Sequence, residues 1–237
     1  MDFITGETLC IDKPLGWTSF DAVKRVRSAL TRRMGIKRLK VGHAGTLDPL
    51  ATGVMIVVTG KSTKQIETLQ AGVKEYVATL QLGATTPSYD LETEIDARYP
   101  TAHITRELID SVLPRFKGTI EQVPPAFSAC KVDGKRAYTL ARRGRQPELK
   151  AKTLVIEEIE ALSFDAEKME LVIRIVCSKG TYIRALARDI GQALESGAHL
   201  TALRRTRVGE VSVDRCMSID QTIELIKTTE ITIPEQV

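Results

Sequence analysis

The sequence predicts a mixed α/β fold, with a largely antiparallel sheet and flanking helices. The first observation is that segments with a period-two pattern of apolar residues alternate along the chain with segments of helical period. The second is a pair of long strand-like segments, at residues 154–162 and 169–177, with only a short turn between them. The third is size, because 237 residues of which 43% are hydrophobic can bury a substantial core.

The N-terminal third is expected to contain two strands, at residues 8–12 and 54–59. Its helices are expected at residues 19–34, where the first serine caps a run with one apolar face, and at residues 62–69. Residues 35–53 are rich in Gly, Thr and Pro, and we expect them to form one long, shaped loop.

The middle of the chain is expected to begin with a strand at residues 76–82, where successive side chains alternate between an apolar face and a mixed one. A helix follows at residues 105–113 and ends before Pro114. The stretch 124–152 is basic and loop-rich, with one helical turn expected near residues 137–143.

After the two long strands, the C-terminal part is expected to contain a helix beyond Gly180, a strand at residues 199–207 and a short helix at 218–227. The first of these helices has an apolar stripe made of Ile183, Leu186, Ala187, Ile190 and Leu194. No internal repeat or flexible linker is visible. We therefore expect one domain over residues 1–210 and a short appendage at residues 211–237.

Charge is segregated along the chain, although the formal net charge is only +4. Basic residues gather at 24–40 and at 131–152, while acidic residues gather at 90–96 and 157–160. Segregation of this kind is typical of a polyanion-binding surface. A pair of solvated helix faces would give the same pattern, so charge alone leaves both readings open.

Several features that the sequence lacks indicate where in the cell the protein is located and whether it uses a cofactor. No apolar run approaches the roughly 20 residues of a membrane span, and the start lacks a secretory signal. Four widely spaced cysteines favour a reducing, cytoplasmic location. The histidines His43, His103 and His199 are dispersed, which argues against a metal site. Neither a phosphate-binding loop nor a dinucleotide fingerprint is complete, so we expect chemistry without a cofactor.

The most informative stretch is the loop at residues 42–53, which contains three glycines and a proline that restrict its backbone. Pro49 directs Asp48 toward an extended conformation, just before a buried strand. A carboxylate on a rigid loop is a candidate catalytic group. An aspartate that only caps a local turn is the alternative.

Arg184 lies beside Ile183 at the start of the helix that follows Gly180. Because Ile183 belongs to the apolar stripe, Arg184 is expected at the rim of the core. An arginine there can orient a carboxylate through two hydrogen bonds and keep it ionised. An exposed helix arginine is the alternative reading.

The loop at residues 42–53 resembles the signature of the TruB family of tRNA pseudouridine synthases. Further motifs of that family follow in the expected order, and the resemblance covers about residues 8–210. They are found at residues 12–19, 74–76, 122–129, 131–134, 180–184 and 203–207. The resemblance implies a pseudouridine synthase fold with a basic RNA-binding insertion.

The resemblance also implies a reaction, the isomerisation of one uridine in the T-loop of tRNA, at the position conventionally numbered 55. The glycosidic bond is broken, the uracil rotates, and a bond from C1′ to C5 is made. The target nucleotide must be flipped out of its stack. The expected enzyme is cytoplasmic and monomeric, takes tRNA as its partner, and needs neither a cofactor nor a metal.

Residue roles follow from the same resemblance. Asp48 is the catalytic aspartate that attacks the sugar or the base, and Arg184 pairs with it. Tyr76 stacks on the target uracil and removes the C5 proton. The remaining roles are packing around the flipped base by Tyr182 and Leu203, stacking beside the extruded loop by His43, and support of the catalytic loop by Lys13.

The basic stretch at residues 124–152 corresponds to the RNA-gripping insertion of the family, often called the thumb. Lys131, Arg142 and Arg143 are its expected RNA contacts, and phosphate contacts of this kind are salt-dependent. Phe127 stands where the family usually has tyrosine. Residues 211–237 are too few for the PUA domain that bacterial relatives commonly carry.

Two other functions agree with the same residues. One is a tRNA-binding chaperone that refolds the T-arm without chemistry, since flipping needs only stacking and basic side chains. The other is the same isomerisation on another RNA. Intact Asp48, Tyr76 and Arg184 favour the enzyme over the chaperone.

Overall fold

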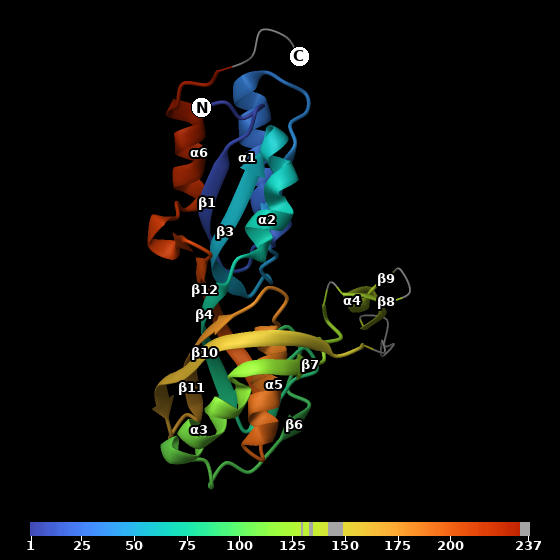
Figure 1. The fold of residues 1–237 in the computed structure, drawn as a ribbon, viewed down its shortest axis with the longest axis vertical. Coiled ribbons are helices and arrows are strands. Elements are labelled where there is room, and N and C mark those ends of the chain that lie inside the picture. The colour runs from blue at the N-terminus through green and yellow to red at the C-terminus, as the bar shows by residue number, and fades with distance from the viewer. Residues whose placement is uncertain (129, 133–134, 142–148, 233–237) are drawn as a thin grey trace. The chain divides into compact units, whose positions relative to one another are not determined.

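The computed structural model describes residues 1–128, 130–132, 135–141 and 149–232 (Figure 1). The chain divides into two compact units. Unit 1 combines Met1–Glu75 with Arg204–Val237, and unit 2 is the continuous stretch Tyr76–Leu203. Both ends of the chain therefore contribute to unit 1, and the middle forms unit 2.

The sheet of unit 1 is centred on β3 (Ala51–Thr59). Strand β1 (Thr8–Lys13) pairs with it antiparallel over its whole length. Strand β2 (Val41–Ala44) pairs with the last four residues of β3, also antiparallel. Strand β12 (Ala198–Val208) comes next to β3 in the strand order and pairs with β13 (Val211–Ser212).

The expectation of one loop over residues 35–53 is wrong in part, because β2 lies inside it and β3 begins at Ala51. Strand β2 has the sequence VGHA, with a single β-branched residue, so its propensity for strand is weak. Its hydrogen-bonded pairing with β3 stabilises a strand that the local sequence favours only weakly. The irregular segment that remains, residues 45–50, is the part that carries Asp48.

Helices cover both faces of this sheet. Helices α1 (Ser19–Met34) and α6 (Ile219–Thr228) pack with Met55 and Val57 of β3 in one apolar core. The short helix α2 (Ile66–Ala71) packs on the opposite face, in a second core that contains alternate residues of β3. Successive residues of β3 therefore point to opposite helical layers, with α1 and α6 on one side and α2 on the other, as Figure 1 shows for unit 1.

Two helix starts differ from the sequence expectation. The cap of α1 is Thr18 rather than Ser19, because Thr18 and Asp21 form a reciprocal capping box. Residues expected to start a helix at Ser62 form a 3₁₀ turn, Gly60–Gln65, before α2 begins. Ser19 is left to bond elsewhere, as described below.

Unit 2 contains the part of β12 up to Leu203, followed in the strand order by β4, β11, β10 and β7. Strand β4 (Lys74–Leu82) buries every second residue, as expected. Strands β10 (Lys152–Asp165) and β11 (Glu170–Cys177) form the expected antiparallel pair, and β7 (Gly118–Gln122) pairs antiparallel with β10. The predicted mixed α/β class with a largely antiparallel sheet is therefore confirmed.

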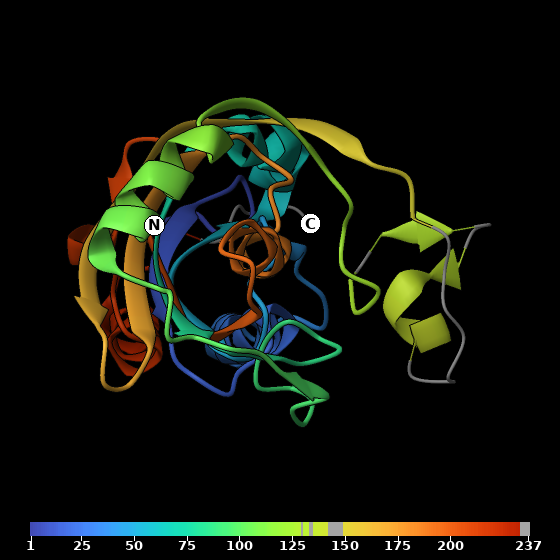
Figure 2. The same cartoon turned by 90° about the horizontal axis from the view of Figure 1, so that it is seen from below.

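Helix α5 (Ile183–Ala193) buries the predicted apolar stripe and is seen along its axis in Figure 2. Gly191 is needed there, since a Cβ would lie 2.4 Å from the backbone nitrogen of Ala198 in β12. Helix α3 (Arg106–Val112) is capped by Thr105 and followed by a 3₁₀ turn that contains Pro114. The remaining short elements of unit 2 are β5 (Ala84–Thr85), β6 (Ala97–Arg98), β8 (Lys131–Val132), β9 (Lys135–Arg136) and α4 (Ala137–Ala141).

The predicted division into residues 1–210 and 211–237 stays a prediction. The described residues after 210 include a 3₁₀ turn, Val213–Arg215, and α6, whose Ile219, Ile223 and Ile226 belong to the core of unit 1. Among the described residues, no helix has the length and apolar character needed to cross a membrane.

Candidate active site

Asp48 lies on the segment 45–50 of unit 1, between β2 and β3, and its side chain is half-buried. The backbone on both sides of it is held in place. The nitrogen of Ala51 donates to the carbonyl oxygen of Asp48 at 3.0 Å, and the nitrogen of Gly16 donates to the carbonyl oxygen of Pro49 at 2.9 Å. The carboxylate therefore stands on restrained backbone, as a reacting group requires.

Ser19 secures the same loop from the start of α1. Its hydroxyl accepts a hydrogen bond from the nitrogen of Leu47 at 2.8 Å and donates to the carbonyl oxygen of Leu47 at 3.1 Å. Both residues are buried. A buried backbone with both polar groups satisfied is rigid and costly to disrupt. The residue expected to cap the helix thus holds the residue before Asp48.

Arg205 lies beneath the loop and is almost fully buried, with 1% of its surface exposed. Its guanidinium donates to the carbonyl oxygens of Val54 at 2.8 Å, Gly45 at 3.2 Å and Thr46 at 3.4 Å. Gly53 lets the backbone of Arg205 come close to β3, because a Cβ there would collide with the carbonyl oxygen of Arg205. The side chain of Arg205 therefore joins the start of segment 45–50 to strand β3.

Lys13 is completely buried at the end of β1. Its ammonium donates to the carbonyl oxygens of Pro14 at 2.9 Å and Trp17 at 2.7 Å. Burial lowers its pKa to about 8, while the nearby Asp48 carboxylate opposes that change. Lys13 thus holds the turn after β1 and places a positive charge close to Asp48, while its support of the loop of Asp48 stays a prediction.

The lowered pKa of Lys13 predicts an alkaline rise in stability. Below its folded pKa of about 8, Lys13 is protonated in the folded and the unfolded chain alike. Between there and the ordinary value of 10.5, only the unfolded chain still holds the proton, so the free energy of unfolding increases with pH. The free energy of unfolding, measured with urea at a pH below and a pH above this window, should increase with pH in the wild-type protein. The Lys13→Met variant should lack this increase. An equal increase in both proteins would assign it to other groups.

His43 lies in β2 and is half-buried. Burial lowers the pKa of its imidazole below the ordinary 6.5, so the ring is neutral near pH 7. A neutral ring is better suited to the stacking role that the resemblance implies than to contact with a phosphate. That role stays a prediction.

In unit 2, Arg184 sits in the first turn of α5 and is 4% exposed, which excludes the reading as an exposed helix arginine. Its guanidinium donates to the carbonyl oxygens of Ser88 at 3.2 Å and Phe127 at 2.9 Å. Its Nε lies 3.6 Å from a carboxylate oxygen of Asp90. Arg184 is therefore held in one orientation by several partners.

Asp90 was not identified from the sequence, where it belongs to an acidic stretch at residues 90–96. It differs from its neighbours in burial, since it is 6% exposed while Glu92 and Glu94 are both exposed. Its carboxylate also accepts a hydrogen bond from the nitrogen of Glu92 at 2.9 Å. No local pattern in the sequence distinguishes Asp90; its burial and its contact with Arg184 become visible only in the fold.

Tyr182 precedes α5 and is fixed through its backbone by Gln122, a buried residue. The amide of Gln122 accepts from the nitrogen of Tyr182 at 2.9 Å and donates to its carbonyl oxygen at 3.2 Å. The hydroxyl of Tyr182 lies 3.2 Å from the sulfur of Cys130. Tyr76, in β4, is 8% exposed, and Leu203, in β12, is half-buried.

Several predicted site residues are not tested by these contacts. The pairing of Asp48 with Arg184 joins residues of different units and stays a prediction. Arg142 and Arg143 lie outside the described residues, and of Lys131 only the backbone, in β8, is described. Across the described part of the chain, no group of three His, Cys, Asp or Glu side chains could hold a metal ion.

Two family models match this chain in succession. The model of the N-terminal domain of TruB family pseudouridylate synthases matches residues 32–183. The model of the C-terminal domain of tRNA pseudouridylate synthase B matches residues 184–232. Together they extend over both units and include most of the motifs described above.

Curated relatives match this chain over nearly its whole length. A tRNA pseudouridine synthase B of Bacteroides thetaiotaomicron is 66% identical over 233 residues, which is 98% of this chain and 97% of the relative. Another, of Parabacteroides distasonis, is 62% identical over 236 residues and covers both chains completely. Among solved structures, a chain of a Cbf5–Nop10–Gar1 complex aligns with a TM-score of 0.69 and 28% identity. That alignment covers 94% of this chain but only 55% of the other, so this chain spans about half of its length.

Proposed function

The chain belongs to the TruB family of pseudouridylate synthases, and on that basis we propose that it converts the T-loop uridine of tRNA, at the position conventionally numbered 55, to pseudouridine. The observation that carries the proposal is Asp48, which is half-buried on a loop braced by Ser19, Arg205 and Gly16 within a full-length match to tRNA pseudouridine synthases. Such a match over the entire chain favours tRNA as the substrate.

The proposed reaction rearranges the atoms of one nucleotide. The bond from C1′ to N1 of the uracil breaks, the base rotates, and C1′ bonds to C5; the proton lost from C5 is balanced by one gained at N1. Since substrate and product are isomers of equal oxidation state, the balance requires no redox cofactor. What the protein must supply is a nucleophile, a base and a pocket for the flipped nucleotide.

The residues of each unit fit these tasks. Asp48 is the nucleophile, toward the sugar or the base, and the charge of Lys13 favours its ionised form. Tyr76 is the base that removes the C5 proton, and Arg184 is the partner of Asp48 proposed from the family motif. Tyr182, which Gln122 holds in place, packs around the flipped base together with Leu203.

A single chain in the cytoplasm is the proposed working form, because tRNA is the substrate and no residue from a second copy is needed for these roles. The proposed thumb, residues 124–152, grips the RNA backbone through Lys131, Arg142 and Arg143. Phosphate contacts of that kind position the RNA without reading its sequence.

The direct test is the release of tritium from an unmodified tRNA transcript labelled at C5 of its uridines. Wild-type protein should release about one tritium per molecule from a transcript labelled to completion, and replacement of the T-loop uridine by cytidine should abolish the release. A folded protein that binds this transcript without release would contradict the proposal and favour the chaperone function. Release that persists in the cytidine transcript would place the target at another site.

A further inference from the structure

A basic groove runs along α1 in unit 1 and is not part of the loop that carries Asp48. Two cavities form it, with volumes of about 480 Å³ and 420 Å³. Both are lined by Arg25 and Ser28, so they are adjacent along α1. We call it the α1–α6 groove, and its principal lining residues are Trp17, Arg25, Ser28, Arg32, Arg33 and Lys227.

The groove is positively charged along its length. Arg25, Arg32 and Arg33 are exposed and, within the described part of the chain, none of them forms an ion pair. Lys227 of α6 pairs with the exposed Glu224 at 3.2 Å, a contact that solvent weakens. The acidic lining residue, Asp21, already accepts hydrogen bonds from Thr18 in the helix cap. Three arginines without carboxylate partners are the kind of surface that binds phosphates.

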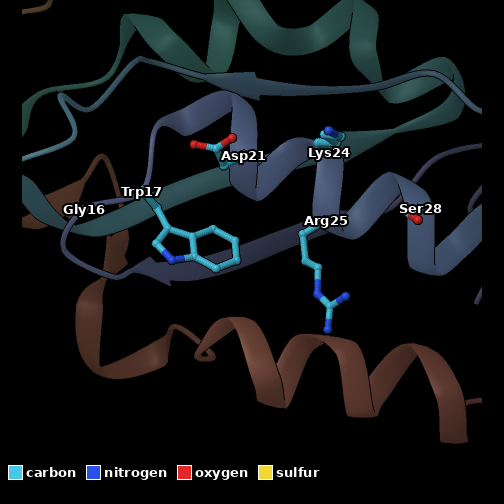
Figure 3. Close-up of a pocket in the computed structure, with 6 residues that line it drawn as sticks. All are labelled: Gly16, Trp17, Asp21, Lys24, Arg25 and Ser28. Carbon is cyan, nitrogen blue, oxygen red and sulfur yellow. The ribbon is translucent and has the colours of Figure 1, made fainter.

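Figure 3 shows how one end of the groove is built. The side chain of Arg25 extends from α1 toward α6, and the indole of Trp17 lies on the same side of α1. Arg25 and Arg32 are seven residues apart on one helix, so they lie about 10 Å apart along its axis. That spacing is on the order of two or three successive phosphates of a nucleic-acid strand.

The groove begins where the catalytic loop is anchored. Gly16 and Trp17 line its first cavity. Gly16 donates to the carbonyl oxygen of Pro49, the residue after Asp48, and Trp17 accepts the hydrogen bond of the buried Lys13. An RNA whose target nucleotide reaches Asp48 thus has a basic channel leading away from it within the same unit.

We propose that the α1–α6 groove binds the sugar–phosphate backbone of the substrate RNA, outside the nucleotides that enter the active site. The proposal rests on the proposed function, since it concerns the same RNA. The arginines hold successive phosphates, and the half-buried indole of Trp17 packs against a ribose or an unpaired base at the end nearest Asp48. This contact adds affinity for the RNA and takes no part in the chemical step, which takes place at the loop of Asp48.

The test compares two triple variants that each remove three positive charges. R25Q/R32Q/R33Q removes the charges of the groove, and K37Q/R38Q/K40Q removes exposed charges of the same basic stretch that do not line it. Dissociation constants for an unmodified tRNA transcript are measured by fluorescence anisotropy over a range of salt concentrations. The groove variant should bind at least about ten-fold more weakly at low salt, with a log–log salt slope reduced by about 2. The control should change the slope by less than about 1.

A second pair of variants guards against a loss of helix stability in the triple variant. Ser28→Glu places a negative charge where the two cavities meet, and Ser28→Gln places a neutral side chain of similar size there. Only the glutamate should weaken binding. The turnover number of the control K37Q/R38Q/K40Q should stay at the wild-type value, and the KM for tRNA should rise in R25Q/R32Q/R33Q and in Ser28→Glu.

The outcomes separate this inference from the proposed function. Equal losses in the two triple variants, or unchanged tRNA binding in both R25Q/R32Q/R33Q and Ser28→Glu, would overturn the groove as an RNA site and leave it to an acidic protein partner. Tritium release by the wild-type protein is unaffected by that result. Absence of release would in turn overturn the proposed function, whatever the binding data show.

Discussion

Turnover of the Asp48→Asn variant is expected to fall at least about 10⁴-fold, which corresponds to about 5.5 kcal/mol of activation free energy. The substitution keeps the shape of the side chain and removes the carboxylate that we propose as the nucleophile. An amide is a poor nucleophile and carries no charge, so no residual pathway of comparable rate is available. Because Ser19, Arg205 and Gly16 hold the backbone of this loop, the pocket should keep its form.

Binding of tRNA provides the second half of this experiment. The affinity of Asp48→Asn for the unmodified transcript should remain within about three-fold of wild type, because affinity is dominated by phosphate contacts elsewhere. Asp220→Asn, the same substitution at an exposed position of α6, is the matched control and should retain full turnover. Loss of affinity in proportion to the loss of turnover would show that Asp48 has a structural role only.

Arg205→Met is expected to lower the free energy of unfolding by about 3 kcal/mol or more. The substitution removes a buried charge and leaves the carbonyl oxygens of Gly45, Thr46 and Val54 without this donor. The loop of Asp48 then loses its hydrogen bonds to β12. Turnover should fall together with stability, since a loop that is misplaced by even 1 Å costs on the order of 10²-fold in rate.

The neighbouring residue offers a matched control. Arg204 points the other way and pairs with Asp12 at 2.7 Å, but its side chain is 43% exposed. Arg204→Met should therefore cost no more than about 1 kcal/mol. Urea unfolding of both variants, with tritium release as the second measurement, makes the comparison. Similar destabilisation by the two substitutions would contradict the bracing role of Arg205.

Features with a strong local signal could be predicted from the sequence. The pair β10 and β11 shows alternating residues on both sides of a short turn, and α5 has an apolar stripe that only a helix can bury on one side. The loop of Asp48 was recognisable from its glycines and its proline. In each case the residues that determine the structure are close together in the sequence.

What could not be predicted depends on residues that are distant in sequence. Arg205 stands in a recognisable motif, yet its partner Gly45 is 160 residues away, and no pattern in the motif indicates burial. Asp90 looks like the rest of an acidic surface stretch until Arg184 is placed beside it. The short strand β2 forms because β3 offers a partner, which is a tertiary effect that overrides its weak propensity.

The discontinuous composition of unit 1 has a consequence for biosynthesis. On the ribosome, unit 2 is the first to emerge in full, because it is one continuous stretch, while unit 1 must wait for residues after Leu203. At roughly 5–20 residues per second, the 160 residues between Gly45 and Arg205 take roughly 8–32 s to synthesise. During that interval the nascent N-terminal segment has neither Arg205 to brace the loop of Asp48 nor α6 to cover the apolar faces of α1 and β1. The loop of Asp48 is therefore among the last parts of the protein to be secured, and a chain that ends before Arg205 contains the loop without its brace.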